Sequence, residues 1–254
     1  MIGIFVVARL GSSRLKKKHL KQALGKSFIQ WLIFRFYIAF IKEIQSKKVH
    51  LFITTSEGDS RNRFFEKIFS SYPDIRIFYG SDENIPLRQL QCAEKYGIDK
   101  IISVDGDDIL CSTNAARKVI KALQNGGSFV ITKGLPIGMN VMGYKTSILK
   151  QSLENNDTKK LETGWGRIFE SIKPDIIFFD GESFELRMTL DYEEDALFFK
   201  KVIEGLGEKI NKITDKKLID YIIKNELNVI NYNLNNKYWE NFTTQKDKEI
   251  NHEK

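Results

Sequence analysis

The sequence predicts an α/β fold, with a doubly wound, mostly parallel sheet, helices on both faces and a small insertion in the second half. Two observations predict it. Over the first half, short runs of β-branched and aromatic residues alternate with longer apolar-rich stretches, which is the rhythm of repeated strand–helix units. Polar turns follow directly after two of these runs, and open α/β sheets bind ligands beyond the carboxyl ends of their strands. The chain has 254 residues, of which 42% are hydrophobic, enough for a sizeable core.

The first half divides cleanly into alternating elements. Ile2–Val7 is a continuous β-branched and aromatic run and therefore reads as a buried strand. The long apolar-rich stretch Phe28–Ile44 reads as a helix, and Asp59–Tyr72 has the apolar face of another. The remaining expected strands are Val49–Thr54, Ile75–Tyr79, Lys100–Val104 and Phe129–Thr132, and the remaining expected helices are Pro86–Tyr96 and Thr113–Gln124.

The second half is less regular. We expect a strand-like insertion at Gly138–Lys145, a helix at Lys160–Ser171, a strand at Phe184–Thr189, a helix at Glu193–Leu206, and a short helix and a turn within Thr214–Asn231. Residues 1–231 are predicted to form a single domain. Residues 232–254 are polar and charged, so we expect a partly disordered tail that is frayed over Gln245–Lys254.

Composition excludes several classes of protein. The net charge is +7, but the lysines are scattered and no nucleic-acid-binding motif appears, so no nucleic-acid partner is expected. No apolar run approaches membrane-spanning length, and the first strand begins at residue 2, which leaves no room for a signal peptide. Cys92 and Cys111 lack a partner motif and read as free thiols in or near the core. We therefore expect a cytoplasmic protein without a membrane partner.

The loop after the first strand has the chemistry of a phosphate-binding site. The stretch FVVARLGSSRLKKKHL carries small residues between cationic ones. Small residues let backbone N–H groups approach phosphates, and the cations neutralise them. The loop contains neither G-x-x-x-x-G-K-[ST] nor G-x-G-x-x-G. The residues concerned are Ala8, Arg9, Leu10, Gly11, Ser12, Ser13, Arg14 and Lys18.

Two further motifs place carboxylates beyond strand ends. In the stretch VDGDDIL, Asp105, Asp107 and Asp108 follow an expected strand, and in LRMTLDYEED, Asp191 stands between a strand and a helix. Mg²⁺ takes hard oxygen ligands and often uses only one or two carboxylates plus phosphate oxygens. The alternative is that these aspartates cap turns and helices.

The three segments together resemble the bacterial cytidylyltransferases of the 3-deoxy-manno-octulosonate (Kdo) and spore-coat-polysaccharide types. The first loop resembles A-R-x-x-S-[ST]-R-L-x-x-K-x-L, with Lys16-Lys17 in place of Pro-Gly and His19 after the lysine. The other two resemble G-D-x-P-L and R-[LV]-T-[LV]-D-[TY]-P-E-D, with the prolines replaced by Ile109 and Glu193. Weaker matches extend the resemblance over nearly the whole chain.

The resemblance implies a Rossmann-like enzyme that couples CTP to an acidic keto-sugar and releases pyrophosphate, in surface polysaccharide or glycan biosynthesis. It implies Mg²⁺ as cofactor, held by Asp107 and Asp191, and a homodimer as a candidate assembly. By the same resemblance, Arg9, Lys18, Asp107 and Asp191 are catalytic; the first loop, Asp82, Arg88 and Asp105 bind the nucleotide; and Asn140, Glu162 and Arg187 bind the sugar.

Several residues depart from the family pattern on the sugar side. Leu87 and Asn140 replace aspartates, Met142 replaces a glutamate, and Thr163 stands where the spore-coat type has histidine. These changes leave alternatives open: an enzyme that uses another nucleotide or a sugar-1-phosphate, or a nucleotide-binding module without catalysis. Trp165 could stack on a ligand, although packing is the simpler interpretation of this residue.

Overall fold

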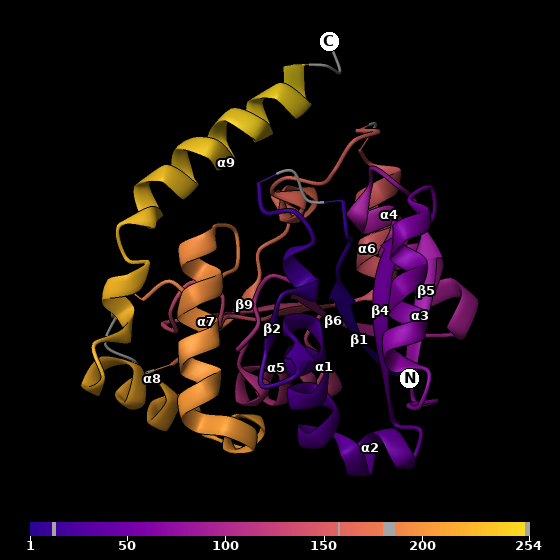
Figure 1. Ribbon diagram of the computed structural model, residues 1–254. Helices are drawn as coiled ribbons and strands as arrows, with labels where there is room; N and C mark the ends of the chain where they lie inside the picture. Colours follow the sequence, from indigo (N-terminus) through magenta and orange to yellow (C-terminus); the bar gives the residue numbers. More distant parts are fainter. Residues whose placement is uncertain (12–13, 157, 180–185, 252–254) are drawn as a thin grey trace.

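A seven-stranded sheet runs through the centre of the computed structural model, which describes residues 1–11, 14–156, 158–179 and 186–251 (Figure 1). Its strand order is β5-β4-β1-β6-β8-β7-β9. β8 is antiparallel to both of its neighbours, and the other pairs are parallel. The strands are β1 (Ile2–Val7), β4 (Val49–Ser56), β5 (Ile75–Gly80), β6 (Lys100–Asp105), β7 (Phe129–Lys133), β8 (Met142–Lys145) and β9 (Asp175–Phe178). The predicted α/β class with a mostly parallel sheet is confirmed.

Helices cover both faces of this sheet. Their bounds are α1 (Phe28–Ala39), α2 (Ile41–Gln45), α3 (Phe64–Phe69), α4 (Ile85–Tyr96), α5 (Thr113–Gln124), α6 (Thr146–Glu154), α7 (Glu193–Leu206), α8 (Asp215–Lys224) and α9 (Leu234–Asn251). A two-stranded hairpin, β2 (Gln22–Ala23) with β3 (Lys26–Ser27), leads into α1. None of the helices in the described part of the chain combines the length and the apolar character needed to cross a bilayer.

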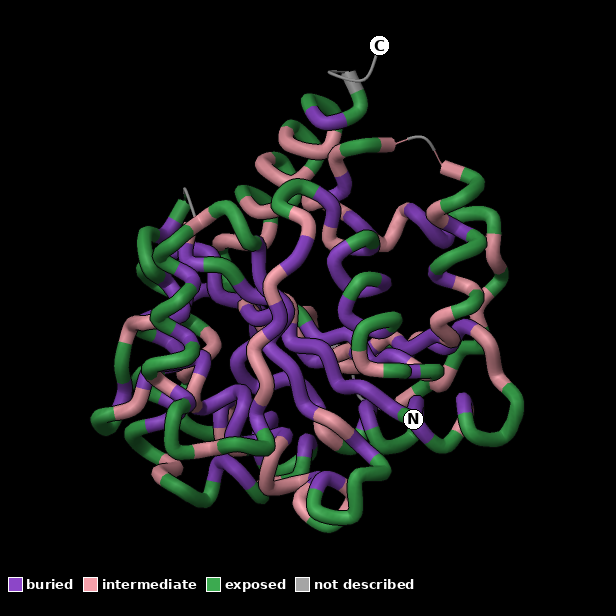
Figure 2. The backbone as a smooth tube through the Cα atoms, turned by 90° about the vertical axis from the view of Figure 1, so that its right-hand side faces the viewer, coloured by how far each residue is buried: buried purple, intermediate pink, exposed green. Residues whose placement is uncertain are grey.

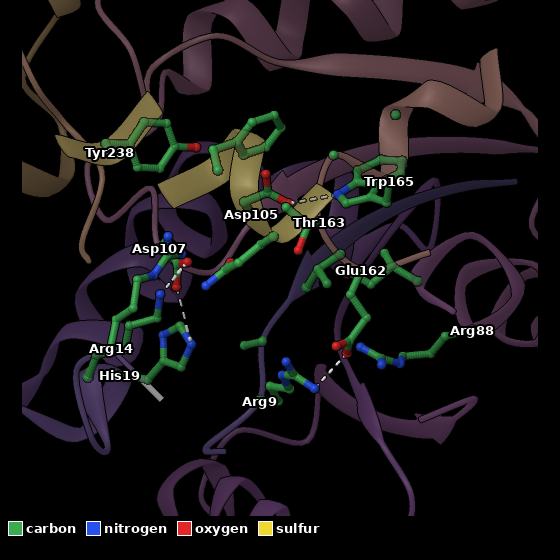
Figure 3. A pocket seen from close by; sticks show the side chains of 18 of the residues that line it. Arg9, Arg14, His19, Arg88, Asp105, Asp107, Glu162, Thr163, Trp165 and Tyr238 are labelled. Carbon is green, nitrogen blue, oxygen red and sulfur yellow. Dashed lines mark hydrogen bonds and ion pairs between the residues drawn. The ribbon is translucent and has the colours of Figure 1, made fainter. Parts of the chain in front are cut away.

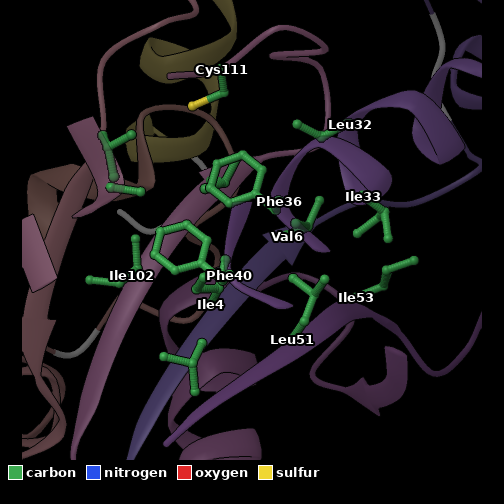
Figure 4. Close-up of a cluster of buried hydrophobic side chains, with 14 of the residues drawn as sticks. Ile4, Val6, Leu32, Ile33, Phe36, Phe40, Leu51, Ile53, Ile102 and Cys111 are labelled. Atoms are coloured by element: carbon green, nitrogen blue, oxygen red, sulfur yellow. The ribbon is translucent and has the colours of Figure 1, made fainter. Parts of the chain in front are cut away.

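The alternation of side chains along β1 divides the core into two layers. Ile4 and Val6 point toward α1 and pack with Phe36 in one cluster of buried side chains (Figure 4). Phe5 points to the other face and meets Phe52 edge-on, in a cluster that α4 and α6 complete. Successive strand residues face opposite sides, so one apolar run serves both layers. Figure 2 shows the buried residues concentrated in these central strands.

A third buried cluster joins the second half of the chain to the first. Phe199 of α7 contacts Phe28 at the start of α1, with 6.1 Å between ring centroids. The buried Arg35 of α1 donates hydrogen bonds to the carbonyl oxygens of Cys111 and Ile210. Helices α7 and α8 therefore pack on the N-terminal half, which brings the segment before α7 to the sheet.

Several expected elements differ in detail. The helix expected over Phe28–Ile44 is interrupted at Phe40, where φ is −116°. The one expected over Asp59–Tyr72 is a 3₁₀ turn, Ser60–Arg63, followed by the short α3. The helix expected over Lys160–Ser171 shrinks to a 3₁₀ turn at Trp165–Phe169, because Gly164 before it has φ of 60°, outside the helical region.

Other differences concern elements that the sequence pattern did not predict. The expected insertion supplies β8, a full sheet strand, and α6 follows it without a loop, so no turn signal marks the change. β9 is a short edge strand with mostly exposed residues. Of the strand expected over Phe184–Thr189, residues 184–185 lie outside the described residues, and the rest makes a single bridge between Ile137 and Arg187.

The expected frayed tail is instead helical over Leu234–Asn251. The sequence of this stretch has no clear apolar face, but one side of α9 contacts the rest of the protein. Cys92 and Cys111 are free and buried, as predicted. The domain division at residue 231 stays a prediction.

The turn at Gly138 should be intolerant of any side chain. Its φ is +85°, and a Cβ there would lie against the carbonyl oxygen of Met188. We expect Gly138→Ala to lower the free energy of unfolding by about 3 kcal/mol or more, measured by urea denaturation. Gly25→Ala is the control, because Gly25 has φ of +75° with nothing within 4 Å of the added Cβ; it should cost only about 1 kcal/mol. Equal losses of unfolding free energy in the two variants would show that the positive φ alone, and not the contact with Met188, accounts for both.

Candidate active site

A pocket of about 450 Å³ opens beyond the carboxyl ends of β1 and β6 (Figure 3). The loop after β1, the loop after β6, the start of α4 and the segment 162–166 form its walls, and α9 completes them. Its lining residues include Ala8, Arg9, Arg14, Lys18, His19, Arg88, Asp105, Asp107, Glu162, Thr163, Trp165, Tyr238, Phe242 and Gln245. The parallel pairing of β1 with β6 ends both strands at the same edge, so two loops far apart in sequence share this pocket.

Lys18 lies between two carboxylates beside the pocket floor. Its Nζ is 2.5 Å from Oδ2 of Asp107 and 3.3 Å from Oδ1 of Asp191, and the residue is only 5% exposed. Burial alone would lower the pKa of Lys18, but the two carboxylates raise it above its ordinary value. Lys18 is therefore a fixed positive charge that joins the loops after β1 and β6 to the segment before α7.

A backbone hydrogen bond brings the two aspartates together. The N–H of Leu190 donates to the carbonyl oxygen of Asp107 at 2.9 Å. Asp191, the next residue, is therefore held beside the β6 loop although 173 positions separate it from Lys18.

Asp191 is buried and surrounded by cations. Arg14 lies 2.8 Å from its Oδ1, and Arg187 donates to its Oδ2 at 3.0 Å. Asp195 in turn binds the Arg187 guanidinium and accepts the backbone N–H of Asp191 at 2.9 Å. Asp195 also accepts the N–H of Tyr192, which caps the start of α7. This network fixes the Asp191 carboxylate in position.

His19 is the second side chain from the loop after β1 that lies beside Asp107. The Nε2 atom of His19 is 3.4 Å from Oδ1 of Asp107, and burial lowers the pKa of this imidazole to about 4. His19 is therefore neutral near pH 7. Burial alone would raise the pKa of Asp107, but the Lys18 ammonium holds it below its ordinary value, so Asp107 is ionised near pH 7.

Asp105 occupies the pocket floor between Asp107 and Trp165. Its Oδ1 accepts the indole N–H of Trp165 at 3.3 Å. Asp105 is exposed to the open pocket, but the protein packed around its carboxyl desolvates it in part and Asp107 adds repulsion, so the pKa of Asp105 rises to about 6. The packing interpretation of Trp165 is incomplete, because its ring also lines the pocket.

The other end of the pocket holds two arginines and a glutamate. Arg9 is paired with Glu162 at 2.6 Å. Arg88 donates to the carbonyl oxygens of Ser81 at 2.8 Å and Asp82 at 3.0 Å, and burial lowers its pKa to about 10, which leaves it charged near pH 7. This end therefore presents cationic groups to an anionic ligand.

Some predicted site residues lie apart from the pocket lining. Leu10 is buried, and its N–H donates to Asn62 at 2.9 Å. The Asp82 carboxylate accepts the N–H of Gly58 at 2.7 Å. Asn140 donates to the carbonyl oxygens of Leu135 and Pro136, and so holds a turn. Gly11 packs near Arg61 and Asp59. Ser12 and Ser13 lie outside the described residues, and Arg187 is buried behind Asp191.

Sequence reasoning missed the residues that α9 contributes. Tyr238, Phe242 and Gln245 line the pocket, but they belong to the stretch expected to be a disordered tail. Their spacing of four and then three residues places them on one helical face, which was the available signal. His19 was seen only as a departure from the family pattern.

Asp107 and Asp191 are the residues here that could hold a metal ion. Within the described ranges, no group of three or more His, Cys, Asp or Glu side chains is arranged to do so. Both carboxylates nevertheless converge on the single Nζ of Lys18, which shows that one cation can contact both. Two carboxylates completed by phosphate oxygens and water suit Mg²⁺.

Comparisons with known proteins identify the family of the chain. Residues 3–166 match the family described as Cytidylyltransferase. An uncharacterized protein of Methanocaldococcus jannaschii, MJ1063, is 23% identical over 249 residues, covering 93% of this chain and 96% of that protein.

Solved structures share the fold. A cytidylyltransferase from Leptospira borgpetersenii is similar with a TM-score of 0.76 and 21% identity, over 89% of this chain and 96% of that one. The CMP:2-keto-3-deoxy-manno-octonic acid synthetase, solved with CTP, is similar with a TM-score of 0.58 and 14% identity, over 80% of this chain and 98% of that one. At these identities the likeness concerns the fold alone.

The raised pKa of Asp105 makes stability depend on pH. A carboxyl whose pKa is higher in the folded state favours folding when protonated, and this contribution is lost as the pH rises through the folded value of about 6. We expect Asp105→Asn to raise the melting temperature more at pH 7 than at pH 4, by a small amount at either pH because Asp105 is an exposed residue and water screens the repulsion. The exposed Asp220, which pairs with Lys216 on the surface of α8, gives the control Asp220→Asn, which should show no such difference. A gain at pH 4 as large as that at pH 7 would contradict the assignment.

Proposed function

The chain belongs to the cytidylyltransferase family, and we propose that it transfers the cytidylyl group of CTP to an acidic keto-sugar, giving a CMP-sugar and pyrophosphate for surface polysaccharide or glycan biosynthesis. The observation that carries the proposal is the buried Lys18 ammonium shared by Asp107 and Asp191 beside a pocket with further cations. Such a constellation suits phosphoryl-type transfer, which needs positioning and charge neutralisation more than covalent catalysis.

The cations are suited to bind the triphosphate. Arg9, Arg14 and Lys18 come from the one loop after β1, and each is now paired with a carboxylate of the protein. In the proposed complex, phosphate oxygens replace those carboxylates as partners. Charge-assisted hydrogen bonds from arginine and lysine to phosphate are strong, and they would stabilise the charge that develops on the leaving pyrophosphate.

Asp107 and Asp191, released from Lys18, would hold Mg²⁺. When bound there, the metal supplies charge neutralisation at the phosphates and lowers the pKa of the attacking hydroxyl. The Arg187–Asp195 network keeps Asp191 in place when the cations move, because it binds the other oxygen of the carboxylate.

The reaction is a displacement at the α-phosphorus. A hydroxyl oxygen of the sugar forms the new P–O bond while the bond to the bridging oxygen of pyrophosphate breaks, and the hydroxyl proton is released to solvent. Retention of both aspartates argues against a module that only binds nucleotides, because such a module needs neither.

The first test is nucleotide choice. In the presence of Mg²⁺, CTP should raise the melting temperature more than UTP, GTP or ATP at equal concentration. UTP is the sharpest comparison, because it differs from CTP at the amino group and ring nitrogen that a cytosine-specific loop reads. Pyrophosphate release should then require CTP together with a member of a panel of acidic keto-sugars.

The outcomes of this test separate the alternatives. A larger shift with GTP or UTP would contradict the CTP assignment while leaving a nucleotidyltransferase. Release with a sugar-1-phosphate but with no keto-sugar would change the acceptor class. Binding of CTP without pyrophosphate release from any acceptor would favour the non-catalytic module.

The second test concerns the two aspartates. Asp107→Asn should lower kcat by about 100-fold or more, since loss of a hard anionic ligand removes several kcal/mol of transition-state stabilisation. Asp191→Asn should do the same, with circular dichroism and the melting temperature showing whether the buried network survives. Glu193→Gln is the matched control, because the Glu193 side chain is 72% exposed and pairs with the surface residue Lys21. Wild-type turnover in either aspartate variant would remove both residues from the proposed metal site.

A further inference from the structure

One face of α9 forms a wall of the pocket. Tyr238, Phe242 and Gln245 line it, and Glu249 follows one turn later on the same face. The positions i, i+4, i+7 and i+11 fall on a single helical stripe. Thr243, the neighbour of Phe242 in sequence, is exposed on another face.

Polar contacts of two residues, Glu249 and Asn241, hold this helix over the pocket. Glu249 is buried, accepts the backbone N–H groups of Glu162 at 3.4 Å and Thr163 at 3.0 Å, and pairs with Arg167 at 3.3 Å. Toward the other end, Asn241 donates to the hydroxyl of Tyr192 at 2.8 Å. The α9 wall, defined as Tyr238, Phe242 and Gln245, is therefore fixed to both the segment 162–166 and the start of α7.

The α9 wall differs chemically from the opposite end of the pocket. Its groups are two aromatic rings and an amide, and the half-buried Phe242 lies against Gly164, where a Cβ would be 2.9 Å from the tip of the ring. The opposite end carries Arg9 and Arg88. In Figure 3, Tyr238 lies across the pocket from both arginines, with Asp107 and Asp105 between the two ends.

This polarity separates the two substrates of the proposed reaction. The triphosphate needs the cations, so it belongs at the arginine end and beside Lys18 and Arg14, whose guanidinium lies 6.0 Å from the centre of the Tyr238 ring. Of the residues expected to bind the sugar, Asn140 and Arg187 are bonded inside the fold, which leaves Glu162 at the pocket. The acceptor must therefore find most of its contacts elsewhere. The α9 wall is an uncharged surface of the same pocket, which Asp107 also lines, and it adds two rings and an amide to the uncharged lining that Thr163 and Trp165 provide.

Resting on the proposed function, we propose that the α9 wall is the specificity-determining surface for the acceptor. The rings of Phe242 and Tyr238 cover the apolar C–H face of an acidic keto-sugar in its ring form, and Gln245 hydrogen-bonds its hydroxyls. Aromatic side chains with a few placed polar groups are the usual lining of a small-molecule site. The acceptor hydroxyl then meets the α-phosphorus next to Asp107.

The test uses 3-deoxy-manno-octulosonate and other acidic keto-sugars as probes. Their binding to the nucleotide-free protein is measured by saturation-transfer NMR, and their KM from pyrophosphate release with CTP and Mg²⁺. Phe242→Ala should weaken sugar binding and raise the sugar KM about tenfold, while the KM for CTP stays within about twofold. Phe242→Tyr should restore the sugar KM, and Thr243→Ala, the control on the exposed face of α9, should change neither constant.

Two outcomes would overturn the inference. One is a rise in the CTP KM with an unchanged sugar KM in Phe242→Ala, which would assign the wall to the nucleotide. The other is CTP-induced stabilisation of the wild-type protein without binding or turnover of any acidic keto-sugar. A third outcome separates the two proposals. If sugar binding depends on Phe242 but CTP does not stabilise the protein, the α9 wall binds the sugar and the proposed cytidylyl transfer is wrong.

Discussion

The ammonium group of Lys18, shared by Asp107 and Asp191, is the interaction on which the rest of the site depends. It joins three segments, since Asp107 is 89 positions and Asp191 is 173 positions from Lys18 in the sequence. Burying these charges is expensive, and removal of one partner from such a cluster typically costs about 3–5 kcal/mol. The arrangement is therefore stable only while each charge has a partner. A triphosphate with a divalent cation offers a second complete set of partners, which is what a transfer site requires.

The fold explains why these charges meet. Parallel pairing of β1 and β6 places the Lys18 loop and the Asp107 loop at one sheet edge. Packing of α7 against α1, together with the Leu190 backbone bond to Asp107, brings Asp191 to the same edge. α9 then closes the far side through Glu249. The pocket thus has a cationic end, an acidic centre and an aromatic wall, in the order that a nucleotide, a phosphorus centre and a sugar would occupy.

The sequence predicted those features of the fold and of the site that depend on local pattern. The alternation of β-branched runs with apolar-faced helices gave the sheet and the bounds of β1 and α7, and the polar turns after strands pointed to the pocket. It missed α6, because that helix follows β8 without a turn, and it missed β9, an exposed edge strand. It also mistook α9 for frayed chain, since the apolar residues of this helix are few and only one face of it touches the protein. Asn140 was predicted to bind the sugar, but its hydrogen bonds hold a turn. That role depends on tertiary packing, which no sequence motif reveals.

The most direct measurement is a crystal structure of the protein with CTP and Mn²⁺, with the metal located by its anomalous scattering. We expect Mn²⁺ bound by Asp107 and Asp191, the Lys18 ammonium moved onto the triphosphate, and the triphosphate at the arginine end of the pocket. A nucleotide bound elsewhere, or Lys18 still bonded to both aspartates with CTP in the pocket, would contradict this expectation.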